Sequence, residues 1–279
     1  MFCKPDRPIP SEPDSSGPAR NPPHFLGVGP EKTGTTWIHH HLAAHPNVQC
    51  PPVKEVRYFY EQHHFPHESV WDRYLKQDAS WHRRDYSLYL AHRLRSLGRH
   101  PYRCLFTRAG RERLYWDLSY LLRKHDDNWY LSLFRPELNG IAGEISPQYF
   151  FLPDTAISHV KSLAPDCKIL ISLRRPTDWL WSFAKMNLAS RFLEKNYGTL
   201  EQFIETKKRY CSFSDAVTRW RRHFPAATHV VFYEDLREDP WTFYRDICDF
   251  LGIAPDPARK ALLPRIVNRG TETPIPEEY

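Results

Sequence analysis

The sequence lacks the features of a membrane, secreted or metal-scaffolded protein. No apolar run in its 279 residues approaches the ~20 residues of a membrane-spanning helix. Residues 1–23 are rich in proline and serine and contain no apolar segment, which argues against a secretory signal and predicts a flexible leader. The six cysteines are widely spaced without a C-x-x-C pair, so neither a zinc site nor a dense disulfide framework is indicated. We expect most of them to be buried free thiols, and one or two disulfides are the alternative.

What is present is the composition of an ordinary globular chain. Apolar residues make up 41% and charged residues 26%, and no internal repeat is visible. We therefore expect one domain over residues 24–279, after the leader. The formal charge of +6 suits an anionic ligand but identifies none.

Apolar runs of strand length alternate with segments of helical periodicity. Strands are predicted at 24–29, 140–146, 167–173 and 228–234, and helices at 35–45, 69–77, 111–125, 176–193 and 239–253, the last of which ends at Gly252. This alternation predicts an α/β fold, a central parallel sheet flanked by helices. Because Lys32 and Arg174 each follow a predicted strand, we expect them at the same edge of the sheet, where such folds bind ligands.

The first strand is followed by "GVGPEKTGTTWI" (27–38), which resembles a phosphate-binding loop with its parts reordered. A Walker A loop has lysine directly after its second glycine, whereas Lys32 precedes Gly34 here. Glycines permit a close backbone approach to an anion, and the amides of residues 33–37 open a helix without helical acceptors. Thr35 and Thr36 add hydroxyl donors. These features favour an anion site over an ordinary glycine turn beside a solvated lysine.

Five segments in order resemble sulfotransferases that use 3′-phosphoadenosine 5′-phosphosulfate (PAPS). "GPEKTGTTWI" resembles their 5′-phosphosulfate loop, and "LRRPTDWLWS" (173–182) their 3′-phosphate motif. "VKEVRYFYE" (53–61) and "GEISPQYF" (143–150) resemble heparan-sulfate-type enzymes, and "VVFYEDLREDP" (230–240) with "FLGI" (250–253) their C-terminal unit. The resemblance implies a P-loop NTPase-like fold, PAPS as co-substrate and no metal. It also implies a set of nucleotide-binding residues: Lys32, Thr33, Gly34, Thr35, Thr36, Trp37, Arg174 and Ser182.

Three positions depart from the pattern of that family. Arg175 stands where the family usually has an acidic or amide residue, and Trp179 lies near the position of a second family arginine. Ile145 replaces a frequent lysine, so a substrate contact is expected to be missing there. Arg174 could also serve as a structural cap at the end of a buried strand. Its bidentate fit to phosphate favours the ligand role instead.

The resemblance also supplies catalytic candidates. Lys32 would stabilise charge on the leaving phosphate. The family's base is implied at Glu55, and Lys54 would position the leaving group or the acceptor; the alternative for both is a pair of solvated charges before a strand. One of the histidines could be the base instead, or His41 and His45 could bind a metal, although the glutamate of H-E-x-x-H is absent. Packing or surface roles are favoured for all four of these histidines: His39, His40, His41 and His45.

The expected activity is therefore transfer of a sulfuryl group to a hydroxyl or amine, with a glycan or small molecule as the acceptor. Arginines at 83, 84, 93, 95, 99 and 103 would suit an acidic glycan, or simply form a solvated helix face. The alternatives are a P-loop kinase or NTPase, and a non-catalytic nucleotide- or glycan-binding relative. No motif beyond charge supports nucleic-acid binding. We expect a soluble, cytoplasmic protein, since a place in the Golgi lumen would need an N-terminal anchor outside this sequence. Residues 266–270 are a further candidate for closing over the nucleotide.

Overall fold

The computed structural model describes residues 21–64, 107, 114–120, 123–135, 140–189 and 196–264. Most of the leader, the predicted helix at 69–77, the six arginines between 83 and 103 and residues 266–270 lie outside the described residues. Residues 114–120 are helical, in agreement with the helix predicted over 111–125.

The centre of the fold is a five-stranded sheet in the order β2-β3-β1-β4-β5, and every pair of neighbours is parallel. The strands are β1 (Phe25–Gly27), β2 (Val48–Gln49), β3 (Ile141–Ile145), β4 (Lys168–Leu173) and β5 (Thr228–Phe232). The chain moves from β1 to the β2 edge, returns to β3 beside β1, and then crosses to β4 on the other side of β1. Such a reversal of strand order opens a crevice at the carboxyl ends of the strands.

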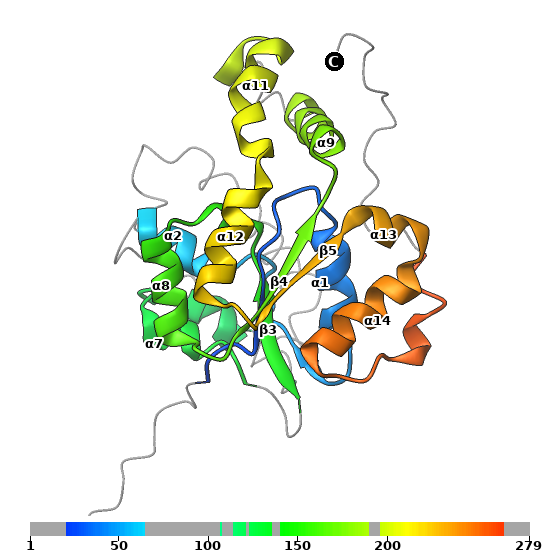
Figure 1. Cartoon of the computed structure of the whole chain (residues 1–279). Helices are drawn as coiled ribbons and strands as arrows, with labels where there is room; N and C mark the ends of the chain where they lie inside the picture. Colours follow the sequence, from blue (N-terminus) through cyan, green and yellow to red (C-terminus); the bar gives the residue numbers. More distant parts are fainter. Residues whose placement is uncertain are drawn as a thin grey trace, which may run out of the picture.

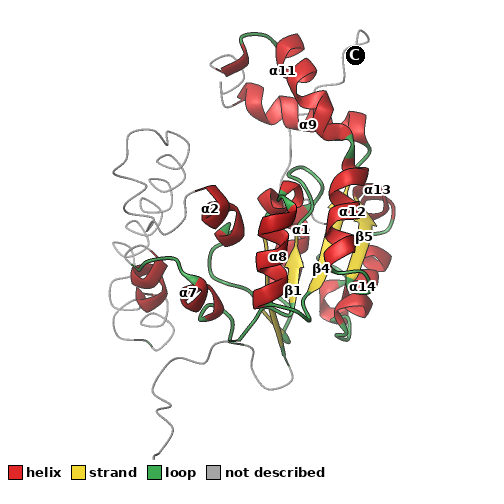
Figure 2. Cartoon of the chain, turned by 60° about the vertical axis from the view of Figure 1, so that its left-hand side comes forward, coloured by secondary structure: helices red, strands yellow, loops and turns green. Residues whose placement is uncertain are grey.

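Helices cover both faces of the sheet (Figure 2). Leu26, Ile169 and Ile171 face one core, which is completed by α2 (Tyr58–His64), α7 (Asp127–Leu131), α8 (Asp154–Leu163) and α12 (Phe213–His223). Phe25, Leu170 and Val231, which alternate with them, face a second core with α1 (Thr35–Ala43), α13 (Tyr233–Glu238) and α14 (Pro240–Leu251). Because both faces are covered, the strands are near-continuous apolar runs, which is why they could be recognised in the sequence.

A smaller lobe stands above the carboxyl ends of the strands (Figure 1). It consists of α9 (Pro176–Ala189), α11 (Leu200–Lys207) and the 3-10 turn η2 (Lys208–Cys211). Trp181, Ala184 and Phe203 form its own core. The lobe therefore covers the edge of the sheet where the ligand was expected.

The predicted α/β architecture is confirmed, and four strands and the helices after the first, third and fourth of them lie where expected. Gly252 ends α14 in the left-handed conformation (φ 80°), and its N–H donates to Cys248 O (2.9 Å). The strand predicted at 228–234 ends earlier, at Phe232, because α13 begins at Tyr233. β2 and the helices α2, α7, α8, α11, α12 and α13 were not predicted. A two-residue strand leaves no periodic signal, and polar helices such as α11 resemble loops in composition.

Two smaller expectations concern cysteines and membrane spans. Cys50, Cys167, Cys211 and Cys248 are free thiols, and two of them, Cys167 and Cys248, are buried. The other two cysteines lie outside the described residues. Among the helices that the structure describes, none is long and apolar enough to cross a membrane.

Gly29 illustrates how tightly the loop after β1 packs on β4. A Cβ at this position would lie 2.2 Å from both the main-chain O and the Oγ of Ser172. We expect Gly29→Ala to destabilise the protein by about 3 kcal/mol or more, because the backbone must shift to relieve the overlap. The measurement is urea unfolding followed by circular dichroism.

Gly34→Ala in the same loop is the matched control. Gly34 has φ 90°, but its added Cβ would meet only side-chain carbons at 3.1 Å. We therefore expect a smaller loss, about 1–2 kcal/mol of left-handed strain. Equal losses for the two variants would contradict the close packing of Gly29 on β4.

Candidate active site

The loop between β1 and α1 is fixed through three consecutive carbonyls. Thr33 Oγ1 donates to Pro30 O (2.6 Å) and also contacts Ser172 Oγ (2.8 Å). The Trp179 indole donates to Glu31 O (2.7 Å), and Arg174 Nη1 lies 3.4 Å from Lys32 O. These hydrogen bonds to its carbonyls hold the backbone of the loop in place.

Two left-handed residues then turn the chain into α1. Lys32 has φ 69° and Gly34 φ 90°, and only the second is a glycine. The first amide with a helical acceptor is that of Ile38, which donates to Gly34 O (3.0 Å). The amides of Thr35, Thr36 and Trp37 therefore open the helix without helical partners, as an anion site requires.

The side chains of this predicted anion site divide into two groups. Thr33 is fully buried and its hydroxyl is engaged within the loop, and the Trp37 indole donates to Leu263 O (3.1 Å) in the core. For these two residues only the backbone N–H is available to a ligand. Thr36 is partly exposed, and Thr35 is buried at the start of α1.

Lys32 lies in a cationic environment. Burial lowers its pKa first, and the positive charges of Arg174 and Lys185 lower it further, against the opposing effect of Glu31. A bound anion would relieve this repulsion, so the loop is electrostatically prepared for a negatively charged ligand. The predicted proximity of Lys32 and Arg174 is confirmed, since Arg174 reaches the carbonyl of Lys32.

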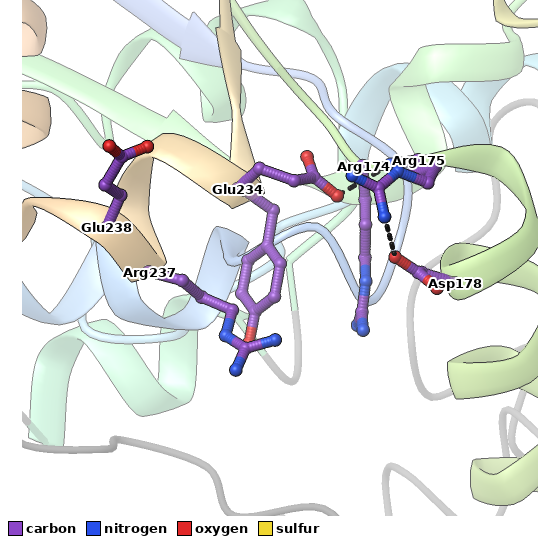
Figure 3. A pocket seen from close by; sticks show the side chains of 7 residues that line it. Arg174, Arg175, Asp178, Glu234, Arg237 and Glu238 are labelled. Carbon is purple, nitrogen blue, oxygen red and sulfur yellow. Dashed lines mark hydrogen bonds and ion pairs between the residues drawn. The ribbon is translucent and has the colours of Figure 1, made fainter. Parts of the chain in front are cut away.

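Arg174 also borders a pocket of about 310 Å³ between α9 and α13. Its guanidinium lies 4.6 Å from the ring centroid of Tyr233. Tyr233 and Arg237 line the same pocket, and Figure 3 shows the Arg174 and Arg237 side chains extending into the same space. An aromatic ring in a pocket lined by arginines suits a ligand that combines a planar base with phosphates.

The neighbouring arginine points elsewhere. Arg175 forms an ion pair with Asp178 (3.5 Å), and its N–H donates to Glu234 Oε1 (3.0 Å). Arg175 also lines the rim of the pocket, where its side chain stays 67% exposed. Ser182, the predicted partner of Arg174, is partly exposed on α9 and does not line this pocket. Trp179, near the position of the family's second arginine, is 2% exposed and anchors Glu31, which gives that departure a structural role.

The second predicted loop brings a carboxylate to the same edge of the sheet. Glu55 pairs with Lys54 and with Arg57 Nη2 (2.9 Å). Burial alone would raise the pKa of Glu55, but these two cations and their hydrogen bonds outweigh it and lower the pKa to about 2. Glu55 and Arg57 have φ of 64° and 60° and, with Lys32, are the non-glycine residues with positive φ among those described. Strain of this kind is concentrated at functional sites.

Glu144 and Ser146 hold this strained loop in place. Glu144 is 1% exposed and accepts from Tyr130 (2.9 Å), Tyr149 (2.8 Å), Ser146 Oγ (2.7 Å) and the N–H of Val56 (3.1 Å). Ser146 Oγ lies 3.2 Å from the N–H of residue 57. The Glu-x-Ser-Pro segment thus positions the 54–57 loop through hydrogen bonds to its backbone. The helix α2, rather than a strand, follows this loop.

The histidines of α1 and of the turn after it have different surroundings. His39 lies near Lys54 and Glu55, and burial followed by the Lys54 charge lowers its pKa to about 4. His41 Nδ1 contacts Arg259 (3.0 Å), and His45 Nε2 contacts Ala254 O (2.9 Å), so both belong to packing around α14. Within the described part of the chain, no group of three or more His, Cys, Asp or Glu residues could hold a metal ion.

Four residues of this region were not predicted from the sequence: Glu31, Gln148, Tyr233 and Arg237. Gln148 Nε2 contacts both Glu31 Oε1 (3.3 Å) and Glu55 Oε2 (3.2 Å) and so joins the two loops. Such cross-loop contacts have no signature in local sequence. Tyr233 and Arg237 had one available signal, since they follow β5 at the same edge of the sheet as Lys32 and Arg174.

A cationic loop and helix-opening amides at the carboxyl ends of a parallel sheet are typical of α/β enzymes that act on anionic substrates. The model of the sulfotransferase family matches residues 23–257, and the chain belongs to that family. It is a sulfotransferase.

Comparison with solved structures agrees with the fold. A sulfotransferase from Alicyclobacillus acidocaldarius is similar with a TM-score of 0.53 and 24% identity over 84% of this chain and 82% of that one. The sulfotransferase domain of the Synechococcus PCC 7002 olefin synthase is also similar, with a TM-score of 0.48 and 22% identity over 95% of this chain and 84% of that one. No curated protein sequence shows significant similarity to the chain.

Proposed function

We propose that this sulfotransferase moves the sulfuryl group of PAPS to a hydroxyl or amine by in-line transfer. The observation that carries the proposal is the convergence of Lys32, Arg174 and Tyr233 at the ends of β1, β4 and β5, with Arg174 in contact with both of the others. The unpaired amides at the start of α1 would receive the 5′-phosphosulfate. Arg174, with Ser182, would receive the 3′-phosphate, and Tyr233 would lie against the adenine.

Lys32 supplies the charge that the reaction needs. As the bond from sulfur to the bridging oxygen breaks, negative charge develops on the 5′-phosphate. A cation fixed within the loop stabilises that charge without reorganisation at the moment of transfer. Placing lysine before the second glycine thus suits a phosphosulfate rather than the triphosphate of a kinase.

The 54–57 loop would border the acceptor. Lys54 and Glu55 are the proposed residues there, and Gln148 keeps Glu55 within reach of the phosphosulfate loop. A carbohydrate acceptor is proposed because residues 53–61 and 143–150 resemble heparan-sulfate-type enzymes. A panel of labelled-sulfate acceptors would test that part, and exclusive transfer to non-carbohydrate acceptors would contradict it.

Calorimetry distinguishes this proposal from a kinase or NTPase. We expect 3′-phosphoadenosine 5′-phosphate (PAP) to bind at least about 100-fold more tightly than ATP with Mg²⁺, because two charge-assisted contacts to the 3′-phosphate are lost with ATP. Tighter binding of ATP with Mg²⁺ would favour the kinase. Binding of PAP without transfer of labelled sulfate to any acceptor would favour a non-catalytic relative.

A further inference from the structure

Two carboxylates, not one, lie at the proposed transfer site, and this inference rests on the proposed function. Glu31 immediately precedes Lys32. The Trp179 indole donates a hydrogen bond to the main-chain carbonyl of Glu31 (2.7 Å), which fixes the backbone that carries the Glu31 side chain. Its Oε1 lies 3.3 Å from Gln148 Nε2, which also lies 3.2 Å from Glu55 Oε2. One amide group therefore joins Glu31 to Glu55.

The two carboxylates have opposite surroundings. Glu55 is held between Lys54 and Arg57, and these cations keep the pKa of its carboxyl at about 2 despite its burial. Glu31 forms no ion pair within the described part of the chain. Burial first, and the charge of Glu55 second, raise its pKa. A base is effective when its pKa approaches the working pH, so Glu31 is the better proton acceptor of the two.

The groups around Glu31 come from four elements. Lys32 shares its loop, while Tyr60 of α2 and a lysine of the lobe interact with it electrostatically. Among the described residues, the titratable and charged groups that interact with it include Lys32, Lys54, Glu55, Arg57, Tyr60 and Lys207. The cations of this set partly offset its burial, but Glu55 has the direct ion pairs.

We propose that Glu31 accepts the proton of the sulfate acceptor, while Glu55 positions Lys54 and Arg57 beside it. In this step the acceptor oxygen or nitrogen forms a bond to sulfur, and the bond between sulfur and the bridging oxygen breaks. The electron pair of that bond leaves with PAP, next to Lys32. The acceptor proton moves to the Glu31 carboxylate and is later released to water.

The test compares Glu31→Gln with Glu55→Gln, using labelled PAPS and two acceptors of similar shape. Phenol must lose a proton during transfer, whereas 4-nitrophenolate has none to lose. We expect Glu31→Gln to lower transfer to phenol by about 10²–10³-fold, and transfer to 4-nitrophenolate by less than about threefold. Glu55→Gln, which disturbs position, should affect both acceptors equally.

The pH profile provides a second readout of the same role. Protonated Glu31 cannot accept a proton, so wild-type transfer to phenol should fall as the pH drops through the pKa of Glu31. That acidic limb should be absent in Glu31→Gln. Equal losses with both acceptors in Glu31→Gln, or the selective loss of phenol transfer in His39→Asn instead, would overturn the proposal.

A measurement that needs no turnover separates this inference from the proposed function. Carbon-13 NMR of labelled glutamates, assigned from the two variants, should show Glu31 titrating above the ordinary 4.5 and Glu55 below it. Glu31 titrating at or below Glu55 would overturn the inference alone. Failure of the wild type to bind PAP in calorimetry would overturn the proposed function and this inference together. We expect Glu31→Gln to bind PAP as the wild type does, because the proposed role of Glu31 concerns the acceptor and not the nucleotide.

Discussion

Lys32→Ala is expected to lower sulfuryl transfer by about 10²–10³-fold, the effect of removing one preorganised charge from a developing anion. The loop itself should survive, because its carbonyls are held by Thr33, Trp179 and Arg174 rather than by the lysine side chain. Affinity for PAP should fall much less than transfer, since the amides at the start of α1 remain. Radiolabelled transfer and calorimetry measure the two effects separately.

Lys161→Ala is the matched control for this loss. Lys161 lies in the last turn of α8, where Nζ donates to Pro165 O (2.6 Å) just before β4 begins. It is therefore at the amino end of the sheet, opposite the proposed site, and its loss should leave transfer unchanged. Transfer by Lys32→Ala at the wild-type rate would remove the lysine from the mechanism.

Arg174→Ala should weaken PAP binding by about 10–100-fold, the cost of one charge-assisted interaction with a phosphate. Its guanidinium bridges the carbonyl of Lys32 and the ring of Tyr233, so the variant loses both a ligand contact and the group that borders the pocket. Calorimetry with PAP gives the dissociation constant directly. Glu55→Gln should have a smaller effect on this constant, because Glu55 borders the proposed acceptor side.

Arg175→Ala offers a control of the same size and charge one residue away. Its guanidinium is already paired with Asp178 and largely exposed (67%). Screened by solvent, such a group contributes little, and we expect a change of less than about threefold. A larger loss in Arg175→Ala than in Arg174→Ala would mean that Arg175, rather than Arg174, is the ligand of the 3′-phosphate in the pocket of Figure 3.

The sequence allowed the phosphosulfate loop and its place in the fold to be predicted, because both depend on local order. The strand before Lys32, the glycines and the threonines are consecutive, and β1 and α1 lie where that order implies. The convergence of Lys32 and Arg174 followed from a topological rule about parallel sheets. Side-chain roles within the loop were less accessible. Thr33 is turned inward and Trp37 packs in the core, which depends on the residues opposite them, Ser172 and Leu263.

The proposed proton acceptor shows most clearly which features the sequence determines and which depend on the fold. By itself the sequence determined a phosphate-type loop with an embedded lysine, an α/β fold and the sulfotransferase resemblance, since each is written in short contiguous segments. Only the tertiary structure decided that Glu55 is paired with two cations while Glu31 has no ion pair with any described residue. It also decided that Gln148, 93 residues from Glu55, contacts both carboxylates. The strength of a carboxylate as a base depends on charges and burial within a few ångströms, and the residues that set them are brought together only by the fold.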